Sequence, residues 1–265
     1  MSVSPASTTD GARSLIVPYR ARFDECGPDG LVRSSALLRY AQDLAWIHSE
    51  RLGFTRDWYT ARNLAWVVRC AELTVLLPLP LGQTISLRTE VIGFRRVWAR
   101  RRTEGRLADG TLALWGNTDW VIVDAERGVP GRFPPEFLAR FEGASQTFEP
   151  GRVTLPAMPT DGGRPHRSLA RPQDTDPMGH VNNAAYLDYF EEALLTEGGE
   201  AAALTAALPR RFRLEYVVPA SPGTEVLGTV WPLAGHEAGC AWRLDDEGGR
   251  ELARGLLTRE AVGEA

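Results

Sequence analysis

The chain of 265 residues contains one segment twice, at an offset of 149 residues. When residues 25–40 are aligned with residues 174–189 without a gap, six of the sixteen positions carry the same residue. These shared positions are Pro28 and Pro177, Gly30 and Gly179, Val32 and Val181, Ala36 and Ala185, Leu38 and Leu187, and Tyr40 and Tyr189. A repeat of this kind constrains the fold strongly, because both copies are expected to adopt one architecture.

The same order of elements follows each copy. Apolar residues at helical spacing predict one long helix in each half. The expected cap and stop residues are Ser34 or Ser35 with Gly53 in the first half, and Asn182 or Asn183 with Gly198 in the second. Alternation of apolar and polar residues then predicts strands at 65–77, 84–93, 97–106 and 112–123, and at 211–218, 225–231, 240–244 and 252–259.

Each half therefore predicts a strand, one long helix and about four further strands, which is an α+β arrangement. Short links between the strands favour antiparallel pairing, with the helix covering one face of the sheet. The second copy or another subunit has to cover the other face, so a homodimer is one expected assembly. Residues 142–166 are rich in Gly, Pro, Ser and Thr, and we expect them to link domains at 14–141 and 167–262.

Composition excludes several classes of protein. Apolar residues make up 43% of the chain and charged residues 24%, which is typical of a soluble globular protein. The net charge of −4 argues against nucleic-acid binding. Three widely spaced cysteines show no metal-ligand spacing, so neither a structural metal nor a disulfide framework is expected. A polar N-terminus and the lack of a membrane-spanning apolar run favour the cytoplasm.

Residues 174–186 form the segment with the most chemistry. It brings the carboxylate of Asp176, the imidazole of His180 and the amide of Asn182 into a turn that leads directly into the second helix. Free N–H groups at a helix N-terminus suit a developing oxyanion, and a nearby carboxylate can act as general base or nucleophile. The pattern is therefore compatible with acyl transfer or ester-type hydrolysis. The alternative is that these residues only cap a turn and a helix, since Asp, Asn and Gly are common in turns.

The two copies differ at these reactive positions. Asp176 aligns with Gly27, and His180 aligns with Leu31. The first copy thus retains the scaffold without the reactive groups, which favours a single active site built mainly from the second copy.

The segment at 174–186 resembles the signature turn and helix start of hot-dog-fold thioesterases. More narrowly, the chain from about Tyr19 to Arg259 is similar to the acyl-ACP thioesterases of bacteria and plants, which are tandem (double) hot-dog proteins. Further similarity lies at 34–53, 66–69, 94–100, 120–124 and 214–216. The resemblance implies hydrolysis of fatty acyl-ACP to free fatty acid without metal or cofactor. It also implies that the first domain holds the acyl chain and carries no catalytic groups.

Carried over by position, Asp176 matches the essential aspartate of the family and His180 matches its active-site histidine; Asn182 is a further candidate. This chain has Met178 where many members have asparagine. It also has Pro219 and Ala220 where plant members place a reactive or acidic residue. Two alternatives therefore stay open: a thioesterase of the same fold acting on acyl-CoA or an aromatic acyl thioester, and a non-catalytic acyl-binding module.

A dense arginine stripe runs along the expected strand at 97–106 and the turn before it. Alternation places Arg96, Arg100 and Arg102 on one side and Arg95 on the other. In an acyl-ACP thioesterase such a stripe could bind the acidic carrier protein or the phosphate of its phosphopantetheine arm. The alternative is a solvated edge strand whose charges prevent edge-to-edge pairing.

Overall fold

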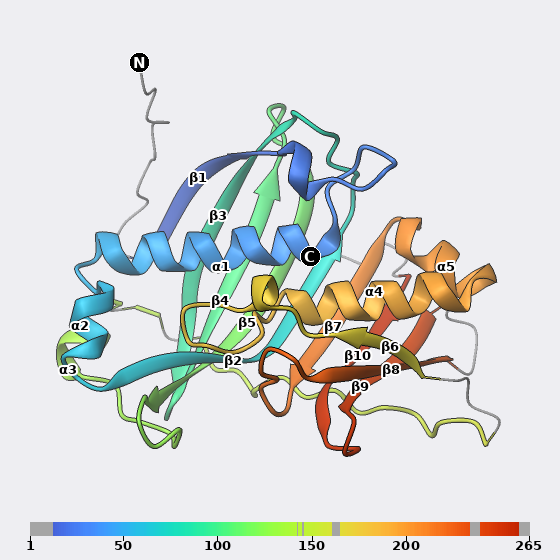
Figure 1. Ribbon diagram of the computed structural model, residues 1–265. Coiled ribbons are helices and arrows are strands. Elements are labelled where there is room, and N and C mark those ends of the chain that lie inside the picture. Colours follow the sequence, from blue (N-terminus) through green and yellow to red (C-terminus); the bar gives the residue numbers. More distant parts are fainter. Residues whose placement is uncertain (1–12, 142, 145, 161–164, 234–238, 260–265) are drawn as a thin grey trace. The chain divides into compact units, whose positions relative to one another are not determined.

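The structure, a computed structural model, describes residues 13–141, 143–144, 146–160, 165–233 and 239–259 (Figure 1). Contacts divide these residues into two compact units. Unit 1 holds the residues up to 69 and those from 77 to 151, and unit 2 holds residues 70–76 and those from 152 onward. Residues 142, 145 and 161–164 of the expected linker, and residues 260–262 of the expected second domain, lie outside the described part of the chain.

Unit 1 is an antiparallel sheet with one long helix, α1 (Ser34–Arg51), across a face of it (Figure 1). The strands lie in the order β1-β3-β4-β5-β2. Their bounds are β1 (Ser14–Arg20), β2 (Leu64–Val75), β3 (Thr84–Arg95), β4 (Trp98–Arg106) and β5 (Leu112–Asp124). Two short helices that the sequence pattern did not predict, α2 (Arg56–Thr60) and α3 (Pro135–Ala139), complete the unit.

Unit 2 repeats this plan around helix α4 (Ala185–Glu197). The second part of β2, from Cys70 to Val75, pairs with β7, and the order continues β7-β10-β9-β8-β6. The bounds are β6 (His166–Leu169), β7 (Arg210–Tyr216), β8 (Glu225–Pro232), β9 (Gly239–Asp246) and β10 (Glu251–Thr258). The prediction of antiparallel sheets, each with a long helix, is confirmed, and each of the eight predicted strands overlaps an observed strand.

The predicted N-caps of both long helices are wrong. The residue before α4 is Ala184, which makes no side-chain capping bond, and not Asn182 or Asn183. Ser34 and Ser35 lie inside α1 and are buried, and the residue before the helix is Arg33, whose side chain makes no capping bond. The backbone just before α1 is held by a hydrogen bond from the Val32 N–H to the Leu79 carbonyl, at 2.9 Å. This tertiary contact positions the start of the helix without a serine cap. Gly198 does end α4, but a second helix, α5 (Gly199–Ala206), starts directly after it.

The repeat detected in the sequence is visible in side-chain contacts. In unit 1 the Glu25 carboxylate is bound by the Arg22 guanidinium at 2.9 Å and by the Tyr40 hydroxyl. In unit 2 the corresponding Asp174 is bound by the Arg171 guanidinium at 3.0 Å and by the Tyr189 hydroxyl at 2.8 Å. Each turn that leads into a long helix is therefore held by the same arginine–carboxylate–tyrosine clamp. We call this contact set the turn clamp.

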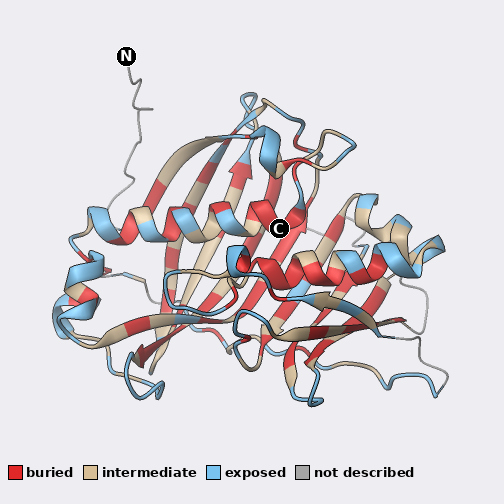
Figure 2. Ribbon diagram, viewed as in Figure 1, coloured by how far each residue is buried: buried red, intermediate tan, exposed pale blue. Residues whose placement is uncertain are grey.

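The long helices bury the face that meets their own sheet and expose the other (Figure 2). In unit 2 the ring of Phe190 stacks on Trp242 with centroids 4.6 Å apart, and both side chains are fully buried. Gly255 makes room for this stack, because a Cβ at that position would lie 2.3 Å from the Trp242 ring. A core of this density fixes α4 firmly on the sheet and so fixes the turn that precedes it.

Candidate active site

The turn from Asp176 to His180 is closed by its own backbone. The Asp176 N–H donates to the His180 carbonyl at 2.9 Å, and the Gly179 N–H donates to the Asp176 carbonyl at 2.9 Å. Gly179 has φ +79°, a left-handed conformation that favours glycine. In unit 1 the aligned turn makes the matching bonds from Gly27 to the Leu31 carbonyl and from Gly30 to the Gly27 carbonyl. The turn is thus a shared scaffold, and its reactive side chains are specific to unit 2.

Three predicted site residues lie on this turn or just after it. The Asp176 carboxylate is half-buried and accepts one hydrogen bond, from the Met178 N–H at 2.8 Å. His180 is exposed, and its imidazole makes no hydrogen bond to any residue that the structure describes. Asn182 is half-buried, and its side-chain oxygen accepts the Ala184 N–H at 3.0 Å, so this amide caps the first turn before α4.

Backbone amides beside the turn are only partly available for an oxyanion. The Val181 N–H donates to the Ala220 carbonyl at 2.9 Å, and the Asn182 N–H donates to the Asp174 carbonyl at 2.8 Å. The amides of His180 and Asn183 have no acceptor within the described residues. These two N–H groups at the start of α4 are therefore free to bind a substrate oxygen.

Asp174 belongs to the turn clamp and not to the reactive groups. Burial raises its pKa, but hydrogen bonds from Arg171 and then from Tyr189 outweigh burial, so the pKa lies below its usual value. The carboxylate accepts the Arg171 backbone N–H at 2.9 Å as well as the guanidinium. Since both carboxylate oxygens of Asp174 accept hydrogen bonds from Arg171 or Tyr189, Asp174 has a structural role. Asp176 is the carboxylate of this segment that is left for chemistry.

Tyr186 is a polar group near this turn that the sequence pattern indicated only as part of an apolar helix face. The side chain is 2% exposed, and its hydroxyl oxygen accepts the Ala220 N–H at 2.8 Å. Burial raises the pKa of Tyr186, the Ala220 N–H lowers it, and the Asp176 charge raises it, with a net increase. Comparison of the two copies could have identified this hydroxyl from the sequence, because the residue of unit 1 that aligns with Tyr186 is Leu37.

The arginine stripe in unit 1 is largely occupied by partners within the unit. Arg100 lies directly opposite Asp119 across the β4–β5 ladder and binds it through two nitrogens, at 2.6 and 2.7 Å. The Asp119 carboxylate also accepts the Gly151 N–H at 2.6 Å, which fastens the segment that leaves unit 1. The other pairs are Arg95 with Glu149, and Arg102 with Glu104 at 2.9 Å.

Arg96 differs from the rest of the stripe. It lies in the turn between β3 and β4, where it is exposed and has φ +55°. No ion pair or hydrogen bond to the described residues occupies its guanidinium. Of the four arginines expected to contact a carrier, Arg96 is therefore the one with a free charge.

Unit 1 also holds an aromatic cluster beneath α2 and α3. Its buried members are Phe54, Tyr59, Val91, Phe137 and Phe141, and half-buried tryptophans and phenylalanines surround them. Arg101 reaches this region from β4 and donates to His48 Nδ1 at 2.9 Å, and burial lowers the pKa of Arg101 to about 10. The guanidinium stays charged at neutral pH, so Arg101 places a cation at the border of the cluster, as does Arg62, whose Cζ lies 4.3 Å from the centroid of the Trp58 ring.

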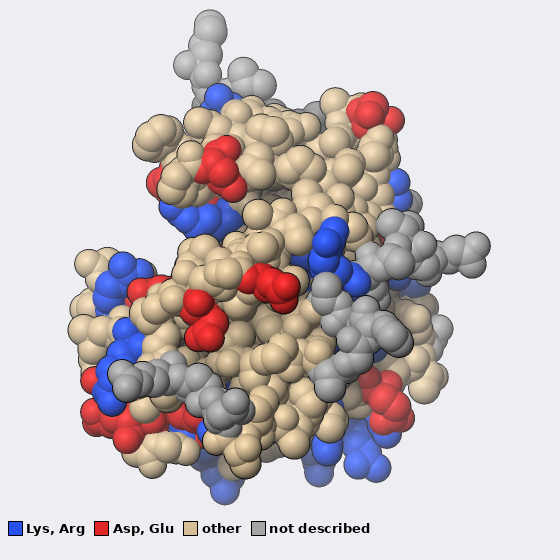
Figure 3. All heavy atoms as spheres, turned by 90° about the vertical axis from the view of Figure 1, so that its right-hand side faces the viewer, with Lys and Arg blue, Asp and Glu red and all other residues tan. Residues whose placement is uncertain are grey.

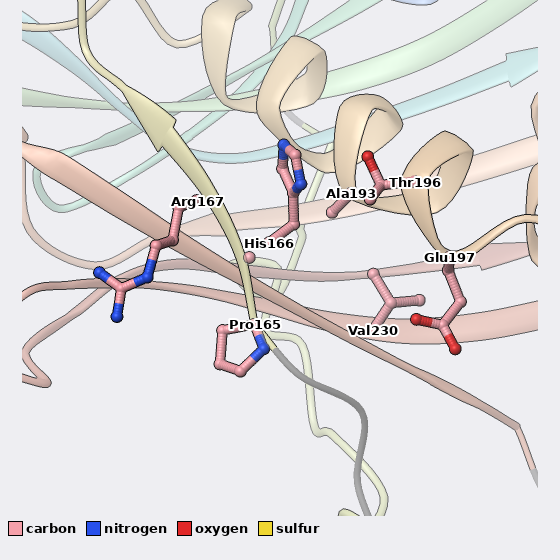
Figure 4. Close-up of a pocket in the computed structure, with 8 residues that line it drawn as sticks. Pro165, His166, Arg167, Ala193, Thr196, Glu197 and Val230 are labelled. Atoms are coloured by element: carbon pink, nitrogen blue, oxygen red, sulfur yellow. The ribbon is translucent and has the colours of Figure 1, made fainter.

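A cavity of about 370 Å³ lies in unit 2 between β6, β8 and the second half of α4 (Figure 4). Its lining residues are Pro165, His166, Arg167, Ala193, Thr196, Glu197, Gly228 and Val230. His166 Nε2 lies 3.3 Å from the Glu192 carboxylate and Arg167 is paired with Glu225, so both side chains have partners outside the cavity. None of the residues of the Asp176 turn lines it, and the cavity is separate from the candidate active site.

Other features of the described residues give no sign of a second kind of site. No group of three or more His, Cys, Asp or Glu side chains in this part of the chain could hold a metal ion. None of the described helices is long and apolar enough to cross a lipid bilayer. On the face shown in Figure 3, uncharged residues predominate, and acidic and basic side chains are scattered among them.

Comparison with known proteins decides the family. Residues 16–141 match the model of the acyl-ACP thioesterase N-terminal domain, and residues 170–217 match the thioesterase-like superfamily. The chain thus carries an acyl-ACP thioesterase N-terminal domain followed by a segment of the thioesterase-like superfamily. It is therefore a thioester hydrolase with a tandem hot-dog fold, as the resemblance implied. A comparison with curated protein sequences found no match.

Solved structures of this family share the fold over nearly the whole chain. The 12:0-ACP thioesterase from Umbellularia californica has a TM-score of 0.77 at 19% identity, covering 95% of this chain and 98% of its own. An acyl-ACP thioesterase from Bacteroides thetaiotaomicron has a TM-score of 0.76 at 17% identity, with coverages of 93% and 98%. A putative oleoyl thioesterase from Lactobacillus plantarum has a TM-score of 0.78 at 18% identity, with coverages of 96% and 99%.

Proposed function

We propose that this thioesterase hydrolyses the thioester of fatty acyl-ACP to a free fatty acid and uses Asp176, His180 and Asn182 to do so. The observation that carries the proposal is the Asp176 turn. It repeats a scaffold found in unit 1, yet it bears a half-buried carboxylate at 176 and an imidazole at 180, where unit 1 has Gly27 and Leu31. The clamp already satisfies Asp174, so Asp176 is the base.

The proposed reaction needs no group beyond these residues and water. Asp176 takes a proton from water, and the oxygen of that water bonds to the thioester carbonyl carbon. The amides of His180 and Asn183 stabilise the oxyanion, while His180 positions the carbonyl and Asn182 holds the turn. The C–S bond then breaks, and the phosphopantetheine sulfur leaves as a thiolate that takes the proton back from Asp176. A thiol has a pKa of about 8.5, so this leaving group needs little assistance.

Unit 1 is proposed to hold the acyl chain, and the aromatic cluster is the apolar surface that suits it. The domain boundaries at 14–141, 142–166 and 167–262 belong to this proposal. So do contacts of the carrier with Arg95, Arg96, Arg100 and Arg102, among which Arg96 offers the free charge while the other three are ion-paired within unit 1. A cytoplasmic location and a homodimer also remain predictions, and the mass of the protein in solution tests the second.

Thiol release from matched acyl-ACP and acyl-CoA substrates over several chain lengths tests the function. We expect faster release from acyl-ACP, and we expect Asp176→Ala to lose it. A preference for acyl-CoA would move the protein to a thioesterase of the same fold with another carrier. Retained acyl binding without any thiol release would make it an acyl-binding module. Label from H₂¹⁸O found in Asp176 after one turnover would show that this carboxylate attacks the carbonyl directly.

A further inference from the structure

Arg101 lies on the opposite face of β4 from its neighbours Arg100 and Arg102, because side chains alternate along a strand. It is directly opposite Val91 of β3, and directly opposed residues of an antiparallel pair share one face of the sheet. Val91 is 2% exposed and belongs to the aromatic cluster. Arg101 is therefore on the face that carries this cluster, and its guanidinium lies 2.9 Å from Nδ1 of His48 on α1.

The charge of Arg101 has no carboxylate partner among the described residues. A guanidinium can only donate, so the Nδ1 of His48 that it binds is unprotonated and the ring is neutral. Tyr59 is the other titratable group beside Arg101, and burial raises the pKa of its hydroxyl, so Tyr59 is neutral as well. By contrast, both neighbouring arginines of β4 are paired with carboxylates.

The surroundings of this guanidinium are apolar but not closed. Burial lowers the pKa of Arg101, and yet the residue is only half-buried and so still reaches solvent. Half-buried side chains of the same cluster, among them Trp66, Phe94 and Phe133, add an accessible aromatic surface. A cation in such a setting is costly without an anion, and the planar fork of a guanidinium matches a carboxylate. The surroundings therefore suit a carboxylate that is attached to an apolar chain.

Unit 2 lacks this arrangement. Counting along the ladders of the two sheets, Cys240 of β9, which is buried, takes the position that Arg101 has in β4. On the long helix, Glu197 takes the position of His48 and is exposed. Because unit 2 forms the same fold with these residues, the scaffold alone does not require Arg101. The arginine occurs in the copy that is proposed to hold the acyl chain.

We propose that Arg101 and the aromatic cluster of unit 1 bind the carboxylate of an amphipathic acid, with the guanidinium on the carboxylate and the aromatic side chains along the apolar chain. Two sources carry this chemistry: a free fatty acid, which is the product of the proposed reaction, and an acyl group with a second carboxylate at its far end. The first binds whether or not the protein cleaves thioesters, whereas the second rests on the proposed function. Loss of the hydrogen bonds between the two charged groups corresponds to roughly ten- to hundredfold weaker binding.

Isothermal titration calorimetry of the full chain with octanoate tests the site directly, and octan-1-ol is the uncharged ligand of equal chain length. Arg101→Met removes the charge and keeps an unbranched side chain, and Arg102→Met is the matched control on the opposite face of β4. We expect octanoate to bind the unmodified protein and Arg102→Met alike, and to bind Arg101→Met at least about tenfold more weakly. The affinity for octan-1-ol should change by less than about twofold. Circular dichroism shows that each variant is folded, and Arg101→Lys, which keeps the charge without the planar fork, should bind octanoate with intermediate affinity.

Hydrolysis kinetics distinguish the two sources of the carboxylate. Suberoyl-ACP carries a second carboxylate at the far end of the acyl group, and octanoyl-ACP has the same chain length without it. If the acyl group is the source, Arg101→Met lowers kcat/KM for suberoyl-ACP by at least about tenfold and leaves that for octanoyl-ACP unchanged. If the product is the source, octanoate inhibits the unmodified protein, and it inhibits Arg101→Met at least about tenfold less strongly.

Two results would overturn the inference while leaving the proposed function intact. One is an equal affinity of the unmodified protein and Arg101→Met for octanoate. The other is the absence of octanoate binding to the unmodified protein together with no selective loss for suberoyl-ACP in Arg101→Met. If the unmodified protein releases no thiol from either acyl-ACP, the proposed function itself fails, and octanoate binding still decides whether Arg101 forms a carboxylate site.

Discussion

Substitution of Asp174 should lower the stability of the protein, whereas substitution of Asp176 should abolish its activity and leave most of its stability. Asp174→Ala removes the acceptor of the Tyr189 hydroxyl, which is buried and would be left without a partner, at a cost of roughly 1–3 kcal/mol. The Arg171 guanidinium is largely exposed, so the lost ion pair adds only about 0–1 kcal/mol. Together we expect about 1–4 kcal/mol of lost stability. For a protein of this size that corresponds to a melting temperature lower by roughly 2–16 °C.

Asp176→Ala removes a half-exposed carboxylate with one accepted hydrogen bond, so we expect less than about 1 kcal/mol of lost stability together with loss of activity. Calorimetry and thiol release on the same preparations measure both effects. Glu25→Ala is the matched control in unit 1, because it breaks the same clamp and should lower the melting temperature without removing a reactive group. The reasoning is refuted if Asp174→Ala melts within about 1 °C of the unmodified protein, or if Asp176→Ala melts as low as Asp174→Ala.

Three further results are expected. The pKa of Asp174 is lower in the folded protein than in the unfolded chain. Its ionised carboxylate therefore stabilises the fold above the unfolded pKa of about 3.9, and this stabilisation disappears as the pH falls through the folded pKa. Asp174→Asn should make the stability measured in urea titrations less dependent on pH in this acid range. A Cβ at position 179 would meet open space, but the backbone there must keep φ +79°. Calorimetry of Gly179→Ala should therefore show roughly 1–2 kcal/mol of lost stability. An unchanged melting temperature would show that the alanine is not strained. Arg96→Glu should raise KM for acyl-ACP several-fold and leave KM for a short acyl-pantetheine unchanged; equal effects on both would rule out a carrier contact.

Much of the fold follows from local patterns in the sequence. Period-two alternation placed β5 within one residue of its observed bounds at each end, and helical spacing found α1 and α4. The serine caps of α1 were wrong because tertiary contacts, and not a side chain, set where that helix begins. The helix α5 was missed because Gly198 predicts a stop, although Gly198 ends α4 and also directly precedes α5.

The candidate site was predictable only where a signal lay close in sequence. Asp176 and His180 stand out because they share one turn and differ from the aligned residues of unit 1. The partners of the arginine stripe were not predictable, since Asp119 and Glu149 follow Arg100 by 19 and 49 residues and only strand pairing and the path of the chain bring them together. Tyr186 has an apolar position in the helix pattern, and its polar contact with Ala220 depends on a loop 34 residues further on.

The central claim is that the chemistry depends on the carboxylate of Asp176 and not on the turn that carries it. Asp29 in unit 1 provides the closest control, because its carboxylate also accepts the N–H of a residue two positions ahead, at 3.0 Å, in the aligned turn. The decisive measurement is kcat/KM for fatty acyl-ACP with Asp176→Asn and with Asp29→Asn. We expect the first substitution to lower it by at least about a hundredfold and the second to leave it unchanged. Equal rates for the two variants, or a rate of Asp176→Asn near that of the unmodified protein, would contradict the account.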